Sequence, residues 1–466
     1  MVFSVEAPVE AAPITLTVGT AITIDPAASV ALRRAIGYAL TVENPAYREA
    51  EEHGRSTRDL DSELRYYRQA DDGALVVPHG AGDIVRALCK EHGVGYTVAH
   101  ETVVAEPVTF DERVTLSPAQ ERAVGEMLAR RTGVLCAPAG SGKTVMAMVM
   151  IARRHQPALI IVHTRELAHQ AIARAVAVLG LDEAEIGLIG DGQCRVGTRL
   201  TVGLVQSLAR GIPPALLGVA FVLVDECHHA PAMQMAAVVS QFPARYIAGL
   251  TATSYRRDRL DRVIHFYLGD TRATIDAADL ADRLVHPRVV KRETGLRPEG
   301  DTFTEIVGQL VADRARNRLI VGDVVRGVKV GRRCLVLSDR VEHVEELTRL
   351  LKAEGVAAAA LHGRLGKKVR AQVVEDLAAG VLDVAVATGS LIGEGFDCPR
   401  LDTLFLATPV SFRGRVVQYI GRVSRSAPGK TDAIVMDYCD DHPMLWSTFR
   451  NRCCVYRTQQ QAGRAA

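Results

Sequence analysis

The chain has 466 residues, of which 48% are hydrophobic and 24% charged, and its formal net charge is +2. This balance is typical of a soluble globular protein, and the length predicts about three domains. The longest apolar runs fall short of the roughly 18 residues that a membrane-spanning helix needs. The N-terminus lacks a basic start followed by an apolar core, so we expect neither a membrane segment nor a signal peptide. The nine cysteines form no CxxC pair, which argues against a disulfide framework and a zinc ribbon and favours reduced thiols in the cytoplasm.

The charge is unevenly distributed along the chain. Residues 1–110 contain nine Arg and Lys against sixteen Asp and Glu, a net charge of −7, whereas the remainder contains 47 against 38, a net charge of +9. A positive excess over the larger part of the chain suits a polyanionic partner such as nucleic acid. Ordinary solvated surfaces carry similar excesses, so charge alone does not assign the partner.

Residues 1–108 are expected to form a small α+β domain without a chemical motif. Hairpins are predicted at residues 14–24, around Gly19-Thr20, and at residues 63–77, around an Asp-Asp-Gly turn. Helices are expected at residues 27–40 and 84–92. The segment therefore predicts a separate folded unit, and its composition does not indicate what it binds.

The segment 133–144, GVLCAPAGSGKT, predicts a nucleotide site. It reads as a buried strand, a glycine-rich turn and the start of a helix, and it fits the Walker A pattern with alanine in place of the first glycine. Gly140 and Gly142 let backbone N–H groups surround an anion, and the helix adds its positive N-terminal end. Lys143 would reach the β- and γ-phosphates of ATP, while the Thr144 hydroxyl would bind Mg²⁺.

From residue 115 onward, apolar strands alternate with helices. Strands are expected at 134–136, 158–162, 200–203, 221–224 and 246–250. Their runs are apolar throughout, as in parallel strands covered on both faces. After a charged, strand-poor connector at about 274–300, a second series is expected at 333–337, 357–361, 381–387, 403–407 and 433–437. The pattern predicts two α/β domains in tandem.

Two carboxylates, Asp225 and Glu226, follow directly after the apolar run 221–224. This places them at the carboxyl edge of the sheet, where the glycine-rich turn also lies. Asp225 could hold Mg²⁺ through water, and Glu226 could orient or deprotonate the attacking water. An isolated surface Asp-Glu pair would look the same, but its position after a buried strand and downstream of a Walker A loop favours the catalytic interpretation.

With these motifs the chain resembles the superfamily 2 helicases of the DExH type, most closely the DNA repair and remodelling branch that includes XPB and UvsW. The resemblance covers about residues 110–455. It implies a fold of two tandem RecA-like parallel-sheet domains preceded by a small α+β domain, with boundaries at 1–108, 109–285 and 286–466. Short matches at 44–47 and 77–80 resemble a leading domain of some prokaryotic and phage members, which would suggest recognition of distorted or branched DNA.

The segment 418–425, QYIGRVSR, resembles the arginine-finger motif of this family. A finger arginine stabilises the charge that develops on the γ-phosphoryl group and contributes about 10³ to 10⁵ in rate. Arg422 and Arg425 are three residues apart, so on a helix they would share one face. Two solvated arginines would show the same spacing, but the complete set of motifs favours the fingers.

The resemblance assigns site residues by function. Those implied in catalysis are Lys143, Asp225, Glu226, Gln418, Arg422 and Arg425. Those implied in nucleotide binding are Gln120, which would read the adenine edge, with Ala139, Gly140, Ser141, Gly142, Lys143, Thr144, Gly395 and Asp397. Those implied in nucleic-acid contact are Thr164, Arg165, Gln206, Ser338, Arg340 and Thr388. Thr251 and Thr253 would couple hydrolysis to domain movement, although Ser254 stands where the family usually has proline. The cofactors are ATP and Mg²⁺, the latter held by Thr144 and Asp225.

The resemblance implies an ATP-dependent DNA helicase or translocase whose ATPase activity is stimulated by nucleic acid. Contacts should be mainly to phosphates and therefore independent of sequence, and an aromatic content of 5% does not support base stacking as the main grip. The expected partner is single-stranded, forked or branched DNA, with RNA less favoured and no membrane. A monomer associated with the nucleoid is expected, with a nuclease or a repair or defence protein as a further partner.

Several alternatives remain open. Within the same chemistry, the chain could be a duplex-DNA translocase of a defence or restriction complex that separates no strands, or an RNA helicase. A nucleotide-gated switch or kinase would need no second α/β domain with an arginine-finger motif. An inactive binding module is disfavoured because every residue needed for hydrolysis is present.

Overall fold

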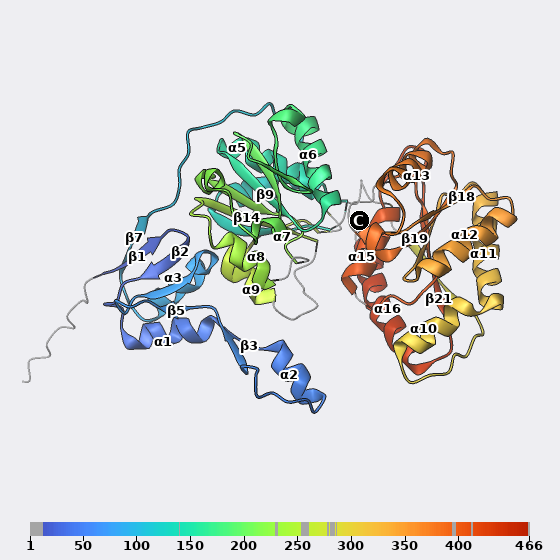
Figure 1. The fold of residues 1–466 in the computed structure, drawn as a ribbon, viewed down its shortest axis with the longest axis horizontal. Coiled ribbons are helices and arrows are strands. Elements are labelled where there is room, and N and C mark those ends of the chain that lie inside the picture. Colours follow the sequence, from blue (N-terminus) through green and yellow to red (C-terminus); the bar gives the residue numbers. More distant parts are fainter. Residues whose placement is uncertain are drawn as a thin grey trace, which may run out of the picture. The chain divides into compact units, whose positions relative to one another are not determined.

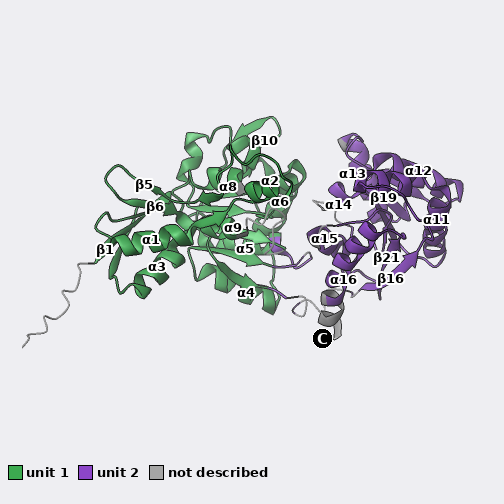
Figure 2. Cartoon of the chain, turned by 90° about the horizontal axis from the view of Figure 1, so that it is seen from below, with its two compact units in different colours: residues 1–136, 144–274 green, residues 137–143, 275–466 purple. Residues whose placement is uncertain are grey.

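The computed structural model describes residues 13–138, 140–228, 232–252, 261–276, 279, 285, 287–393, 398–411 and 413–464. They form two compact units, shown in Figure 2. The first unit comprises the residues up to 136 together with 144–274, and the second comprises 137–143 together with the residues from 275 onward. The domain boundaries at 108 and 285 stay predictions.

The chain begins with a five-stranded sheet in the order β5-β6-β2-β1-β7 (Figure 1). Its strands are β1 (Ile14–Val18), β2 (Ala21–Ile24), β5 (Arg68–Gln69), β6 (Leu75–Pro78) and β7 (Tyr96–His100). The helical elements of this region are α1 (Val30–Ala39), α2 (Pro45–Glu52), α3 (Gly82–Glu91) and the short 3₁₀ helix η1 (His79–Ala81). The hairpin predicted at residues 14–24 is confirmed, because β1 and β2 pair antiparallel.

The hairpin predicted at residues 63–77 is only partly correct. Its first residues form β4 (Glu63–Arg65), which pairs with β3 (Thr41–Glu43) in a separate two-stranded ribbon, and only β5 pairs with β6. The buried Tyr66 separates the two pairings, because its N–H donates to the Leu40 carbonyl at 2.9 Å and brings the chain back to the main core.

The five-stranded sheet shares a hydrophobic core with α9 (Asp261–Leu268). Val263 and Phe266 of this helix pack among the buried residues of the sheet and α1, and the rings of Tyr66 and Phe266 lie 5.5 Å apart. Gly80 of η1 meets the end of α9 so closely that a Cβ there would lie 2.4 Å from the Gly269 nitrogen. The N-terminal sheet is thus packed firmly against the rest of the first unit.

The remainder of the first unit is built on an eight-stranded sheet in the order β11-β10-β12-β9-β13-β14-β8-β15. Its strands are β8 (Thr132–Cys136), β9 (Ala158–Val162), β10 (Gly187–Gly190), β11 (Gln193–Arg195), β12 (Leu200–Leu204), β13 (Phe221–Val224), β14 (Tyr246–Thr251) and β15 (Thr271–Thr274). All neighbours pair in parallel except β10 and β11, which form a hairpin. The five strands predicted from apolar runs are all present; β10, β11 and β15 lie outside those runs.

Helices cover this sheet on both faces (Figure 1). They are α4 (Pro118–Leu128), α5 (Lys143–Arg154), α6 (Arg165–Leu179), α7 (Val205–Leu208), α8 (Ala232–Val239) and α9, with the 3₁₀ helices η2 (Glu183–Glu185) and η3 (Pro214–Gly218). Leu159 and Ile161 of β9 pack in one core with residues of α7, α8 and α9. Burial on both faces is the reason that the strand sequences are apolar throughout.

The second unit contains a six-stranded parallel sheet in the order β16-β21-β20-β17-β19-β18. Its strands are β16 (Pro287–Glu293), β17 (Cys334–Ser338), β18 (Ala358–Leu361), β19 (Val384–Thr388), β20 (Thr403–Leu406) and β21 (Ala433–Cys439). Its helices are α10 (Phe303–Ala312), α11 (Arg314–Lys329), α12 (Val341–Ala353), α13 (Lys367–Ala379), α14 (Gly389–Gly393), α15 (Arg413–Val423) and α16 (Pro443–Arg464). Two hydrophobic cores, one on each face, confirm the predicted α/β architecture.

The stretch at 274–300 that was expected to be a strand-poor connector contains a strand of the sheet, because β16 runs parallel to β21 over seven residues. It lies at the edge of the sheet, so it pairs with one neighbouring strand and only part of one face is buried. Val289 packs against the core, while Arg288, Lys291 and Glu293 are exposed. An edge strand of this kind lacks the continuous apolar run that reveals buried parallel strands. None of the described helices is both long and apolar enough to cross a membrane.

Candidate functional site

The glycine-rich loop lies between β8 and α5, as predicted. Gly140 and Gly142 have φ angles of +89° and +83°, which side chains with a Cβ rarely adopt. Lys143 is 8% exposed, and its Nζ donates to the Ala137 carbonyl at 3.1 Å. Thr144 follows in the first turn of α5. A lysine drawn into a loop with two left-handed glycines has the donor set that a triphosphate requires.

The two carboxylates follow β13, separated from β8 in the sheet by β14 alone. Asp225 is buried. Its N–H donates to the Ile161 carbonyl at 2.9 Å, and its Oδ1 accepts the Glu226 N–H at 2.9 Å. Glu226 has a φ of +46°. Backbone strain of this kind costs about 1–3 kcal/mol and concentrates at functional sites. Parallel strands end at the same edge, so the loop after β8 and these carboxylates leave one edge of the sheet.

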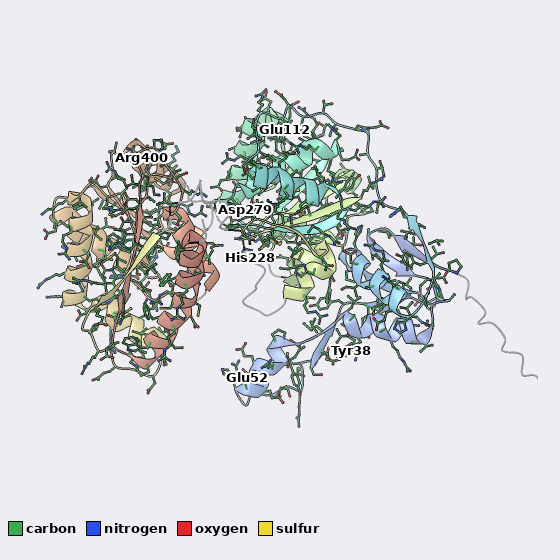
Figure 3. The ribbon with its side chains drawn as sticks, turned by 180° about the vertical axis from the view of Figure 1, so that it is seen from behind. Tyr38, Glu52, Glu112, His228, Asp279 and Arg400 are labelled. Carbon is green, nitrogen blue, oxygen red and sulfur yellow. The ribbon has the colours of Figure 1, made fainter. Side chains whose placement is uncertain are left out.

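A buried histidine connects the second carboxylate to the end of β14. His228, labelled in Figure 3, has its Nδ1 3.4 Å from Glu226 Oε2 and 2.8 Å from Thr251 Oγ1. His228 and Thr251 are 7% and 3% exposed. The sequence indicated Thr251 for coupling but gave His228 no function. The sequence signal that could have indicated a function for His228 was its place as the fourth residue of the Asp-Glu-Cys-His motif.

Gln120 has a structural function that the sequence did not predict. It is the third residue of α4, where its Oε1 accepts the Ser117 N–H at 3.0 Å and its N–H donates to the Ser117 hydroxyl at 3.4 Å. This reciprocal pair is a capping box that satisfies the start of the helix. The proposed contact of Gln120 with adenine stays a prediction.

The three nucleic-acid residues predicted in the first unit lie together. Thr164, Arg165 and Gln206 line one cavity of about 550 Å³ between the start of α6, the β10–β11 hairpin and α7. Thr164 caps α6 by accepting the Leu167 N–H at 3.2 Å, and Gln206 donates to the His163 carbonyl at 3.0 Å. We refer to this cavity as the α6 groove.

The three nucleic-acid residues predicted in the second unit lie at the carboxyl edge of its sheet. Ser338 ends β17 and is paired in register with Thr388, which ends β19. Arg340 occupies the N-cap position of α12 without a side-chain capping hydrogen bond, and it is exposed. Thr388 is 7% exposed, and its hydroxyl has no hydrogen-bond partner among the described residues. Ser338 is instead held by His343, whose Nδ1 lies 2.9 Å from its hydroxyl.

The arginine-finger residues depart from the prediction in one respect. Gln418 and Arg422 lie on α15, and the Arg422 Nε donates to the Ile392 carbonyl at 3.1 Å. Arg425 lies beyond the end of the helix at Val423, so the expectation that both arginines share one helix face is wrong. Pro428 restricts only Ala427, the residue before it, so it does not by itself explain why the helix ends at Val423.

Some predicted residues lie outside the described part of the chain: Ala139, Thr253, Gly395 and Asp397. Across the described residues, no three or more His, Cys, Asp or Glu side chains gather in a way that could hold a metal ion. Mg²⁺ is commonly held by one or two carboxylates together with phosphate oxygens, so a site built from Thr144, Asp225 and the nucleotide fits the residues present.

Comparison with known proteins adds two family matches. Residues 113–256 match the family "Type III restriction enzyme, res subunit", and residues 318–427 match "Helicase conserved C-terminal domain". The chain is 25% identical over 303 residues to the probable helicase D10 of Escherichia phage T5, covering 64% of this chain and 65% of that protein. It is 28% identical over 249 residues to the DNA 3'-5' helicase XPB of Kineococcus radiotolerans, covering 48% and 44%. It thus spans less than two thirds of either relative.

Among solved structures, Dbp5 of S. cerevisiae bound to RNA and ADP BeF3 aligns with a TM-score of 0.57 at 15% identity, covering 74% of this chain and 88% of that one. At this identity the likeness concerns the fold alone. The fold and both family matches agree with the motifs read from the sequence.

Proposed function

We propose that this chain, which belongs with the superfamily 2 helicases of the branch that includes XPB, hydrolyses ATP and acts on DNA. In this proposal it moves along or remodels single-stranded, forked or branched DNA. The similarity to a DNA 3'-5' helicase supports DNA, whereas another similar protein is named an RNA helicase, so RNA is included in the test below. We further propose that it works as a monomer associated with the nucleoid in the cytoplasm.

The observation that carries the proposal is the contact of the buried His228 with both Glu226 and the buried Thr251. When bound, Mg-ATP supplies the transferable phosphoryl group and a cation that neutralises its charge. Lys143 binds the phosphates, Asp225 and Thr144 hold the cation, and Glu226 orients the attacking water and takes its proton. His228 contacts both the catalytic carboxylate and the end of β14, so a movement of either one shifts the partner of the other.

The second unit supplies the remaining functions in this proposal. Arg422 and Arg425 stabilise negative charge on the γ-phosphoryl oxygens during hydrolysis, and Gln418 lies on the same helix as Arg422. The hydroxyl of Thr388 lacks a partner among the described residues, and a backbone phosphate of the strand would provide one. The contacts of both units are directed to phosphates, so binding is independent of base sequence.

The first test of the proposal measures ATP turnover by the full chain with single-stranded, duplex, forked and four-way DNA and with RNA. We expect stimulation by DNA, strongest with the preferred structure, and loss of turnover in Lys143→Ala and Glu226→Gln. Glu226→Gln should still bind ATP, because it retains the phosphate loop. Equal turnover with and without every nucleic acid would contradict the proposal, and stimulation by RNA alone would reassign the substrate.

A second candidate is favoured by the match of residues 113–256 to the restriction-enzyme family. The chain would then be a duplex-DNA translocase of a defence complex that separates no strands, and cleavage would require a partner nuclease. Strand-displacement and triplex-displacement assays distinguish the two candidates. A translocase removes a third strand from duplex DNA but leaves a forked duplex intact.

A further inference from the structure

The β10–β11 hairpin places a fixed carboxylate in the α6 groove. The two strands are joined by Asp191-Gly192, with φ angles of +52° and +78°. An Asp-Gly pair with both angles positive is typical of a two-residue hairpin turn. A Cβ on Gly190 at its present backbone geometry would lie 2.6 Å from the Leu204 side chain, so the hairpin packs closely on β12. Asp191 is therefore positioned by the fold.

Both oxygens of this carboxylate contact basic side chains of α6. Asp191 Oδ1 lies 3.1 Å from Arg165 Nη1, and Oδ2 lies 3.1 Å from His169 Nε2. Arg165 and His169 are separated by one helical turn at the start of α6. An anion held by an arginine beside a helix N-terminus is the arrangement in which proteins hold a phosphate group.

Asp191 also stands out by its charge. Among the described residues that line the α6 groove, it is the only acidic side chain, whereas Arg165 and Arg210 are basic. The side chain of Arg165 is 67% exposed and that of Asp191 is 24% exposed. A salt bridge at such an exposed site is weak and can be exchanged for another anion.

We propose that Asp191 occupies the position of a nucleic-acid phosphate at Arg165 and that an incoming strand must displace it. The carboxylate thereby weakens the binding of nucleic acid in the α6 groove. Arg165 becomes available only to a nucleic-acid phosphate that displaces Asp191. This inference rests on the proposed function, in which the groove carries the strand. The opposite possibility is that Asp191 orients Arg165 for the phosphate, and the two make opposite predictions for a neutral variant.

The test is the binding of a fluorescein-labelled oligothymidylate to the full chain without nucleotide, titrated over a range of NaCl concentrations. Asp191→Asn keeps the turn, because asparagine tolerates positive φ. We expect it to bind about two- to fivefold more tightly than the wild type at low salt. Its dependence of log K on log salt should be steeper by about 0.7, the value for one additional phosphate contact with a single strand.

Two further variants make the result specific. Asp111→Asn is the matched control, since Asp111 forms a 2.7 Å exposed ion pair with Arg113 and does not line the groove. It should leave the salt slope unchanged. In an Arg165→Ala background, Asp191→Asn should no longer steepen the slope, because the released arginine is absent.

The possible outcomes separate the two proposals. Unchanged or weaker binding by Asp191→Asn, with normal binding by the wild type, would overturn the inference and leave the proposed function intact. A steeper slope that persists without Arg165 would also overturn it. If neither the wild type nor Asp191→Asn binds DNA or RNA at low salt, the proposed function fails together with the inference.

Discussion

At the scale of single residues, the structure places beside the proposed hydrolysis site a histidine to which the sequence motifs gave no function. His228 lies between the carboxylate of Glu226 and Thr251, the last residue of β14. Polar side chains that contact one another in a network stabilise one arrangement of the site, because each side chain loses a partner if another moves. The strained backbone of Glu226 belongs to the same site.

This connection predicts the effect of removing one hydroxyl. Thr251→Val keeps the shape of the side chain but removes its contact with His228. A hydrogen bond of ordinary net strength, about 0.5–1.5 kcal/mol, corresponds to a two- to tenfold change. We expect the DNA-stimulated rate of ATP hydrolysis to fall by this factor, measured at saturating ATP and DNA.

Thr348→Val is the control for Thr251→Val. Thr348 is equally a buried threonine, but its hydroxyl donates to the Val344 carbonyl within its own helix at 2.7 Å. Its stimulated rate should match the wild type. A stimulated rate in Thr251→Val equal to that of the control would exclude a coupling function for the contact.

A second residue-scale prediction concerns pH. Burial, with a smaller contribution from Arg316, lowers the pKa of His343 from 6.5 to about 3. His343 is therefore protonated below about pH 6.5 in the unfolded chain but only below about pH 3 in the folded chain. The free energy of unfolding should decrease as pH falls through this window, by at most about 1.4 kcal/mol per pH unit from this group.

Urea unfolding can be followed through Trp446, the only tryptophan of the chain, which lies in the same unit as His343. Measured at several pH values, His343→Gln should lose more of the pH slope than His442→Gln, a half-buried histidine in that unit. Equal slopes in the two variants would show that His343 does not carry the effect.

At the scale of elements, the packing of the N-terminal sheet against α9 depends on close backbone contact. Gly80→Ala would place a Cβ 2.4 Å from the Gly269 nitrogen, and backbone cannot rotate away as a side chain can. Overpacking of this kind costs about 1–3 kcal/mol. We expect a lower midpoint of thermal unfolding for this variant.

Gly125→Ala is the matched substitution for Gly80→Ala. A Cβ at Gly125 would meet nothing within 4 Å, and the residue lies within α4, where alanine is favoured by up to about 1 kcal/mol. Its midpoint should stay the same or rise. If both variants have the wild-type midpoint of thermal unfolding, the prediction is wrong and the backbone contact between η1 and α9 is not tight in solution.

The elements that the sequence predicted share one physical property. Buried parallel strands such as β9 and β13 require apolar residues on both faces, so their sequences reveal them without further information. β16 and β4 escape this rule because each is exposed along an edge or in a ribbon, and their pairing is set by distant partners.

The same distinction applies to the candidate site. Lys143 and Asp225 were found because local sequence dictates a strand, a turn and a helix around them. The contact of Asp191 with Arg165 could not be found, because it joins a hairpin tip to a helix start that lies 26 residues earlier. That contact exists only after β10 and β12 have paired.

At the scale of the whole molecule, the proposed reaction uses groups from both units. The first unit carries Asp225, Glu226 and the α6 groove, and the second carries the arginine-finger motif and the edge with Ser338 and Thr388. A motor of this class requires that hydrolysis depend on groups from both units. The arginine fingers are therefore the part of the proposal with the largest consequence.

The most direct measurement of this claim is the DNA-stimulated ATPase rate of Arg422→Ala and Arg425→Ala, alongside the affinity of each for a fluorescent ATP analogue. The control is Arg349→Ala, an exposed arginine of the second unit that pairs with Glu346 within its own helix. The account predicts a loss of about 10³-fold or more in rate for the two finger variants, with nucleotide binding retained and the control unchanged. Wild-type turnover in both finger variants would contradict it.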